Sequence, residues 1–231
     1  NYEANTLIEI QARGEAEEAQ TVYQSDAFGQ LVLQLDPLGR PTEYAYDDWG
    51  NMTVITDATG AVTHNRYDKV GRPTATVDQA GDETVYVYDE TDRLLSVTDP
   101  EDGTTAYTYS PDGRDNLVAL TNANGATTTY DYDALDRLIT ETNALGAFTT
   151  YAYDNLNRLT ERTDAEGRVT LYTYDAKSRM RRAEYWEAGE TSPYQTNRYR
   201  YDGAGNLVWT ANEDVRLAYD YDGLDQRTRI D

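Results

Sequence analysis

Few residues in this chain could do chemistry. It holds one histidine, His64, and no cysteine among 231 residues. A catalytic triad needs a histidine base beside an activated nucleophile, and a zinc site needs several histidine or cysteine ligands. His64 has no such companions, so we interpret it as an exposed strand residue. The absence of cysteine also excludes disulfide bonds and thiolate chemistry.

Carboxylates are abundant, with 42 Asp and Glu residues, so some pair must fall at the separation used by glycosidases through chance alone. Two aspartate triplets have a spacing that could suggest calcium ligands: Asp131, Asp133 and Asp136, and Asp220, Asp222 and Asp225. Both triplets lack the glycine and distal glutamate of an EF-hand loop. We therefore predict that the chain is not an enzyme and that it has no catalytic residue, no bound metal and no cofactor.

The basic residues form one cluster, at Lys177, Arg179, Arg181 and Arg182. Alternation along a strand would place Lys177, Arg179 and Arg181 on one face, where we expect neighbouring acids to pair with them. The triplet at residues 51–53, Asn-Met-Thr, matches the acceptor pattern for N-glycosylation, which by itself is a weak signal.

The net charge of −22 limits the classes of partner. Nucleic acids and anionic membrane surfaces attract cationic proteins, so we expect neither as a partner. No apolar run approaches the ~20 residues of a membrane span, which argues against membrane insertion. The first 20 residues lack the basic and apolar regions of a signal peptide, and the sequence does not begin with Met. We interpret it as a piece of a longer protein.

Tyrosines recur at a fixed interval, which identifies an internal repeat. They stand at positions 23, 46, 67, 88, 109, 132, 153, 174, 201 and 221, and five of the nine intervals are 21 residues. The clearest unit runs over residues 153–174, and an aspartate follows most of the tyrosines. The motif residues to which we assign a structural role are Tyr46, Asp47, Gly50, Tyr67, Asp68, Gly71, Arg72, Tyr88, Asp89, Arg93, Tyr132, Asp133, Arg137, Gly146, Tyr153, Asp154, Arg158, Gly167, Tyr174, Asp175, Tyr201, Asp202, Gly205, Tyr221 and Asp222.

Each unit contains two clusters of Gly, Asn and Asp, which are turn residues. Between the turns lie short runs rich in Thr, Val, Tyr and Leu, such as residues 52–56, 159–163, 126–132 and 169–174. These runs are too short for helices and have the composition of strands. The sequence predicts an all-β fold, a repeat array of antiparallel β-hairpins that forms a long twisted ribbon.

Period-two geometry places Thr170, Tyr172 and Tyr174 on one face of this ribbon. We expect Tyr151 and Tyr153 of the neighbouring unit to lie alongside them and form a tyrosine ladder across the strands. Stability would then be a sum over neighbouring units, as in other repeat proteins.

Three segments depart from the regular repeat. Residues 1–22 lack the glycines, and we interpret them as a degenerate or capping repeat that precedes a single array over residues 23–231. The unit at Tyr109 has two extra residues in its first turn. The unit at Tyr174 has six, which enlarge the hairpin over residues 185–194. This loop is either a tolerated surface insertion or a protruding contact for a partner or for another part of the ribbon.

The repeated pattern Y-D-x-x-G-R-L, followed by T-D-x-x-G and T-x-Y-x-Y, resembles the YD repeat of the Rhs family over residues 23–231. That family includes bacterial Rhs polymorphic toxins, Tc toxin B and C components and teneurins. The resemblance implies a ribbon wound in a spiral into a hollow shell. In the toxins the shell encloses a C-terminal toxic domain. Residues 36–39, Asp-Pro-Leu-Gly, match part of the family's cleavage signature, but more repeats follow them, so we interpret them as a repeat turn.

The resemblance therefore predicts a structural shell segment that shields a C-terminal toxin or cargo domain of the same polyprotein. It also predicts a secreted or cell-surface location after export, with secretion-system or cell-surface partners. The alternative is a cell-surface adhesion or carbohydrate-binding module, in which exposed tyrosines stack on glycans.

Overall fold

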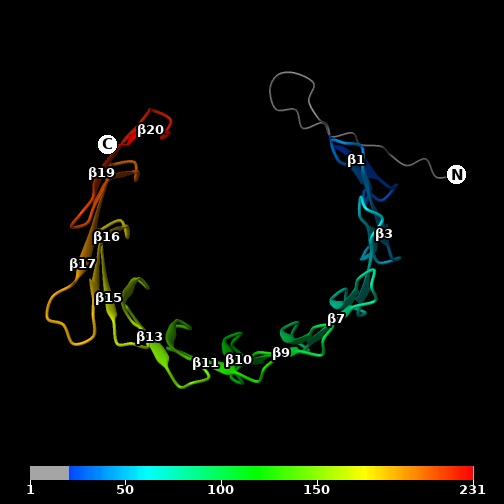
Figure 1. Cartoon of the computed structure of the whole chain (residues 1–231), viewed down its shortest axis with the longest axis horizontal. Coiled ribbons are helices and arrows are strands. Elements are labelled where there is room, and N and C mark those ends of the chain that lie inside the picture. The colour runs from blue at the N-terminus through cyan, green and yellow to red at the C-terminus, as the bar shows by residue number, and fades with distance from the viewer. Residues whose placement is uncertain (1–20, 231) are drawn as a thin grey trace. The chain divides into compact units, whose positions relative to one another are not determined.

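A computed structural model describes residues 21–230 of the chain (Figure 1). The predicted degenerate or capping repeat at residues 1–22 lies almost wholly outside these residues. The described part contains strands and turns and no helix, so it has no helix that could cross a lipid bilayer. The described part divides into two compact units, residues 21–108 with 121–125, and residues 109–120 with 126–230.

The first unit is a meander in which each strand pairs antiparallel with the next along the chain. Its strands are β1 (Val22–Ser25), β2 (Leu31–Leu35), β3 (Pro41–Tyr46), β4 (Met52–Thr56), β5 (Val62–Tyr67), β6 (Pro73–Val77), β7 (Glu83–Tyr88), β8 (Leu94–Thr98) and β9 (Thr104–Tyr109).

The second unit repeats this arrangement, again with antiparallel pairing between consecutive strands. Its strands are β10 (Leu117–Thr121), β11 (Thr127–Tyr132), β12 (Leu138–Thr142), β13 (Phe148–Tyr153), β14 (Leu159–Thr163), β15 (Val169–Tyr174), β16 (Met180–Trp186), β17 (Gln195–Tyr201), β18 (Leu207–Ala211), β19 (Arg216–Tyr221) and β20 (Arg227–Ile230).

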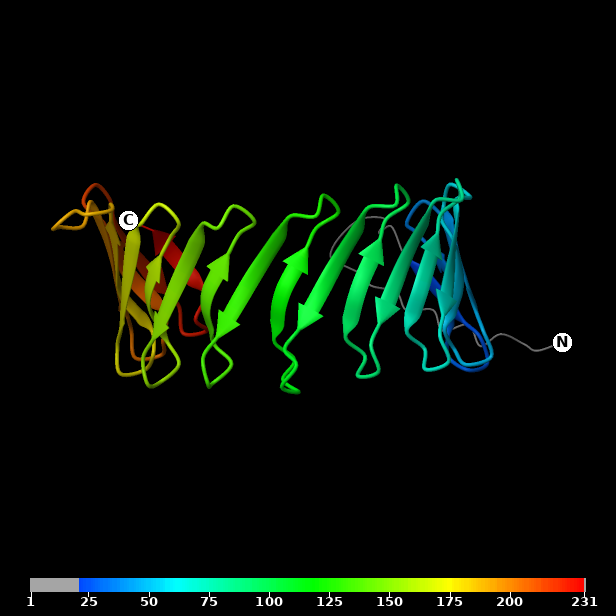
Figure 2. The ribbon, with the colours of Figure 1, turned by 90° about the horizontal axis from the view of Figure 1, so that it is seen from below.

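The predicted hairpin array is confirmed, and several strand limits agree with the sequence to the residue. In both units the turns alternate between the two edges of the sheet (Figure 2). One edge carries the turns that follow the Tyr-Asp pairs, and the other carries the second turn of each unit. Where a strand meets its Tyr-Asp turn the pairing shifts by a β-bulge, as between Ala152 and Tyr153 opposite β14.

The sheet is a single layer without an ordinary hydrophobic core. Among the described residues only Ala75, Ala183, Ala211 and Thr196 are buried, and no large side chain is fully buried. A strand normally hides one face against a second layer. Here consecutive hairpins cover one another only through their neighbours, so stability depends on links between adjacent units.

The tyrosine ladder differs from the prediction. Strand β14 lies between the tyrosine-bearing strands β13 and β15, and Arg162 is the residue paired with both Tyr151 and Thr170. Equivalent tyrosines are therefore one strand apart and do not pair directly.

Candidate functional site

The Tyr-Asp turn is the recurring polar site of the chain, and Asp154 shows how it is built. One carboxylate oxygen, Oδ1, accepts the backbone N–H groups of Leu156 and Arg158 at 2.9 and 3.1 Å. The other, Oδ2, accepts the Nε–H of Arg158 at 2.7 Å. The Asp154 N–H donates to the Arg158 carbonyl at 2.9 Å. A short side chain with an acceptor oxygen is required because it must close the turn on its own backbone, and the second carboxylate oxygen of an aspartate also pairs with the arginine.

The fourth residue after the tyrosine of a Tyr-Asp turn has a left-handed backbone. Gly50 and Gly71 have φ of +87° and +86° there, and Asn157 has +61°. Glycine adopts this region without strain, and Asn and Asp tolerate it better than other residues. This requirement explains the preference for Gly, Asp and Asn at this position, where Ser178 also adopts a φ of +61°.

Arg158 joins its own turn to the next. Its Nη1 donates to the carbonyl of Asp175 at 3.2 Å and to the hydroxyl of Ser178 at 3.4 Å. Its guanidinium lies over the ring of Tyr174, 4.8 Å from the centroid. A planar cation with several donors is suited to this combined role. The arginine thus contacts two consecutive repeats.

The same link recurs along both units. Three further arginines bond to the preceding aspartate, reach the carbonyl of the next one and lie over the next tyrosine, as Arg158 does: Arg72, Arg137 and Arg179. Where asparagine replaces arginine, Asn206 still bonds to Asp202 and to Asp225 of the following turn. The sequence motif indicated a turn but not this connection between repeats.

The tyrosine hydroxyl makes a link in the opposite direction. Tyr174 donates to the carbonyl of Leu159, the first residue of β14, at 2.8 Å. The pairing of β14 with β15 begins only at Glu161 and Leu171, so the Leu159 carbonyl lies beyond the ladder and the hydroxyl satisfies it. Equivalent bonds from hydroxyl to carbonyl are made by Tyr46, Tyr67, Tyr132, Tyr153 and Tyr221.

These contacts change the acidity of the motif residues. The hydrogen bond from Arg158 lowers the pKa of Asp154 below its ordinary value of 3.8, and Arg137 and Arg179 lower the pKa of Asp133 and Asp175 in the same way. Partial burial raises the pKa of Tyr153 and Tyr174. The aspartates accept hydrogen bonds as anions and the tyrosines donate hydrogen bonds through their hydroxyls. Both residue types therefore stabilise the turns and strands.

The remaining sequence candidates have separate locations. His64 is exposed on β5, as predicted. The segment that begins with Asp36 forms the turn between β2 and β3, as predicted, with Asp36 accepting the N–H of Leu38. Asp136 of the first acidic triplet accepts hydrogen bonds from Arg114 and Asn116. Within residues 21–230 no three His, Cys, Asp or Glu side chains gather closely enough to hold a metal ion.

The basic cluster does not form the paired strip that the sequence predicted. Lys177 and Arg179 lie in a turn, because β16 begins only at Met180. Lys177 donates to the carbonyl of Gly203, and Arg179 pairs with Asp175. Arg181 is exposed and no ion pair is found for it within the described part of the chain. Strand alternation failed as a guide because a turn and a bulge occupy this segment.

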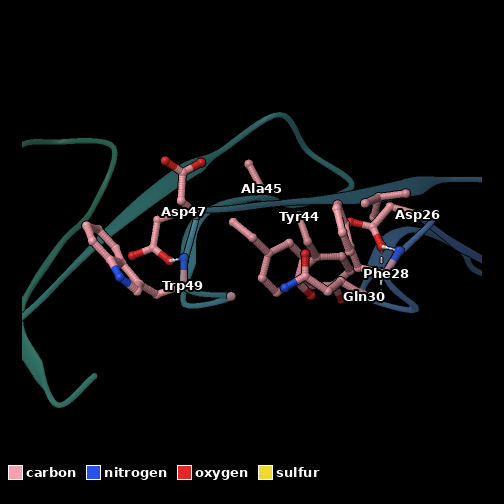
Figure 3. A pocket seen from close by; sticks show the side chains of 11 residues that line it. Asp26, Phe28, Gln30, Tyr44, Ala45, Asp47 and Trp49 are labelled. Carbon is pink, nitrogen blue, oxygen red and sulfur yellow. Dashed lines mark hydrogen bonds between the residues drawn. The ribbon is translucent and has the colours of Figure 1, made fainter. Parts of the chain in front are cut away.

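Hollows of the surface lie between consecutive Tyr-Asp turns. One of about 480 Å³ is lined by Phe28, Gln30, Tyr44 and Trp49, among others (Figure 3). In this view Asp47 bonds to the backbone of Trp49 and Asp26 to that of Phe28. The aspartates are thus occupied by the turns, and the aromatic rings provide the open contact area.

Apolar side chains project from the tips of the Tyr-Asp turns. Phe28, Trp49 and Val70 of the first unit are 90, 85 and 72% exposed, and the same turn position in the second unit is occupied by further exposed apolar residues: Leu135, Leu156 and Leu224. These apolar tips recur at the same turn position, with polar Thr91 and Lys177 at two of the turns between them.

Comparison with known families decides the classification. The model of the RHS repeat matches residues 26–62, 67–104, 88–114, 112–147, 132–168 and 153–190. The chain belongs to the RHS repeat family. This confirms the resemblance of the Tyr-Asp motif, and the matched segments of the RHS repeat array include most of the turns described above.

Among solved structures, the chain is similar to TcdB2-TccC3 without its hypervariable C-terminal region, at 17% identity and a TM-score of 0.47, over 93% of this chain and 17% of that one. The Photorhabdus luminescens Tc holotoxin pore, in a TccC3 mutant, is matched at 18% identity and a TM-score of 0.33, over 91% and 16%. A porin-like protein from Bacteroides uniformis is matched at 14% identity and a TM-score of 0.33, over 82% and 87%. Comparison with curated proteins gave no match.

Proposed function

We propose that this RHS repeat array is a segment of the wall of a hollow shell. The shell encloses a C-terminal toxin or other cargo domain of the same polypeptide and shields it until delivery. The location that follows is outside the producing cell, secreted or at the surface after export, with secretion-system or cell-surface components as further partners. The array acts by covering the cargo and excluding other molecules from it, and the motif residues of the array have structural roles.

One observation carries the proposal, namely a single-layer sheet whose turn tips expose apolar side chains. Trp49 and Leu156 are 85 and 67% exposed at equivalent turns. A sheet with no second layer and apolar turn tips is suited to lie with those tips against further ribbon, which covers the exposed apolar side chains. A wall built in this way keeps proteases and solvent-borne partners from what it encloses.

The motif links support the same role. Each arginine of the Arg158 type bonds to two repeats, and each tyrosine of the Tyr174 type bonds back to the preceding short strand. A wall that surrounds an incompletely folded cargo needs cooperative stability along its length, and links between nearest neighbours provide it.

The test is protease protection of the cargo in the full-length parent protein. We expect a cargo domain within the intact protein to resist a protease that cleaves the isolated domain rapidly. Leu135→Asp with Leu156→Asp places charge at two apolar turn tips and should make the enclosed cargo sensitive. Thr91→Asp is the matched control, because Thr91 occupies the same turn position and is already polar and exposed.

Two results would contradict the shell. One is cleavage of the cargo at the same rate inside the parent protein and in isolation. The other is a solid rod without a lumen when the full-length protein is viewed by electron microscopy.

A second candidate function is glycan binding at a cell surface, favoured by the hollow of Figure 3. Tyr44 and Trp49 line it beside Gln30, and aromatic rings with a polar neighbour are suited to stacking on sugars. A glycan array should then show a ligand whose binding is abolished by Trp49→Ala and kept by Val70→Ala. An array on which the wild-type chain retains no glycan excludes this function.

A further inference from the structure

Strands β16, β17 and β18 hold a concentration of arginines that the repeat does not explain. A cleft of about 770 Å³, here called the arginine cleft, is lined by Arg179, Arg181, Arg182, Arg198, Arg200 and Trp209, with four further residues. Only Arg179 occupies the motif position. The other arginines form a cluster of positive charge, which is unexpected in a chain with 20 basic and 42 acidic residues.

Strand register brings the arginines together. Arg182 of β16 is paired directly with Arg198 of β17, and Arg200 is paired with Trp209 of β18. Arg181 is the extra residue of a bulge, because Thr173 and Tyr174 of β15 pair with Arg182 and Met180. Like charges placed directly opposite each other destabilise a sheet unless an anion lies beside them, and only Arg182 of this pair has such an anion among the described residues, in Glu184.

Several arginines of the cleft have no ion pair with an acidic side chain among the described residues. Glu184 pairs with Arg182, and the carboxylate of Glu213 is taken by the backbone N–H of Thr196. For Arg181, Arg198 and Arg200 no ion pair is found within residues 21–230. Arg182 also keeps a buried Nε–H that has no hydrogen-bond partner among the described residues. The cleft therefore has three guanidinium groups without an ion pair among the described residues.

The spacing of these groups indicates what would fit. Arg198 and Arg200 lie two residues apart on β17 and both are exposed, which places them on one face about 6.6–6.8 Å apart. An extended peptide has the same period, so carboxylates on alternate residues would meet both arginines. The Arg200 guanidinium lies 4.7 Å from the Trp209 ring and is thereby held in place.

We propose that the arginine cleft binds a short acidic peptide segment in an extended conformation, through carboxylates on alternate residues. Guanidinium groups bind carboxylates with two parallel hydrogen bonds, which fixes both position and orientation. The net charge of −22 repels long polyanions such as nucleic acid, so a local anion on a peptide is favoured over a nucleic acid strand. This site is independent of whether the ribbon closes into a shell.

The experiment uses the 231-residue chain and two labelled octapeptides of one composition, with blocked ends. The first alternates serine and glutamate. The second has glutamates in adjacent pairs separated by two serines, so that no two glutamates are two residues apart. An octanucleotide of thymidine is the nucleic-acid probe. We measure binding by fluorescence anisotropy at physiological salt.

We expect the alternating peptide to bind about tenfold more tightly than its isomer and than the oligonucleotide. Arg198→Gln with Arg200→Gln should weaken its binding by about tenfold or more. The control, Arg66→Gln with Lys69→Gln, removes the same charge elsewhere, from residues that are exposed in the first unit, and should leave binding unchanged. Without peptide, the Arg198 and Arg200 variant should be at least as thermostable as wild type, because it removes an opposed charge.

Four results would overturn the proposal. The first is equal binding of the two peptides. The second is equal loss of binding in the cleft variant and the control, and the third is tighter binding of the oligonucleotide. A cleft variant that is clearly less stable than wild type would also overturn it, because the arginines would then be needed for the fold.

Discussion

The hydroxyl of Tyr174 donates a hydrogen bond to the carbonyl of Leu159, 2.8 Å away and 15 residues earlier in the chain. This bond crosses from β15 to the start of β14, at a point where the strand ladder has ended. In the opposite direction Arg158 contacts the turn after Tyr174. Two motif side chains thus connect each repeat to the one before it and the one after it.

The first prediction concerns the hydroxyl. Tyr174→Phe keeps the ring and removes the donor, which should lower the free energy of unfolding by about 1 kcal/mol, the net value of one hydrogen bond. For a chain of this size the thermal midpoint should fall by roughly 2–4 °C. Tyr199→Phe is the control, because no hydroxyl bond is found for Tyr199 within the described residues. Equal midpoints for the two variants in a circular dichroism melt would contradict the prediction.

The second prediction concerns the arginine link. Arg158→Ala removes the contacts to Asp154, to the Asp175 carbonyl and to the Tyr174 ring together. We expect amide hydrogens in both flanking hairpins to exchange faster, because the link spans two repeats. In Arg66→Ala, which removes an exposed ion pair to Glu83, exchange should change only locally. Faster exchange confined to the Arg158 turn would show that the link does not couple the repeats.

The third prediction is a loss of stability in acid. The pKa of Asp154, and of Asp133 and Asp175, lies below the ordinary 3.8 in the folded chain, chiefly through hydrogen bonds from the arginines. The folded state therefore binds fewer protons than the unfolded state near this pH. The resulting stabilisation is present above about pH 4 and is lost as the pH falls through the lowered pKa values.

Urea unfolding at about pH 7 and about pH 2.5 measures this effect. The unfolding midpoint should be lower at the acidic pH than at the neutral one. Asp154→Asn keeps an acceptor for the turn and removes one titrating group, so its midpoint should change less between the two pH values. If the urea unfolding midpoint of the wild type is the same at both pH values, the aspartates do not stabilise the fold through their lowered pKa values.

The fourth prediction separates backbone strain from packing. Gly60 has φ of +85° and a Cβ added there would meet nothing within 4 Å, so Gly60→Ala is strained by its backbone alone. We expect a loss of about 1–2 kcal/mol in the free energy of unfolding. Gly203→Ala adds a methyl group in equally open space without a left-handed φ and should be neutral or slightly stabilising. Similar losses for both variants would show that the left-handed backbone is not the cause.

Much of the fold followed from local chemistry. The limits of β4, β14 and β15 were predicted because glycine and aspartate mark turns within the residues that need them. The assignment of residues 36–39 to a turn held for the same reason. Predictions that depended on the register between strands were less accurate. The sequence predicted a ladder of neighbouring tyrosines, but Arg162 lies between Tyr151 and Thr170.

The sequence alone determined the repeat, the turns and the all-β class, because these depend on residues close together along the chain. The tertiary structure decided which repeats Arg158 and Tyr174 connect, and it placed Arg182 opposite Arg198. Those pairings depend on a bulge at each Tyr-Asp turn and on an enlarged hairpin after β16. A one-residue shift at a bulge or in the enlarged hairpin changes which side chains share a face of the sheet. The residues next to these features in the sequence do not indicate such a shift.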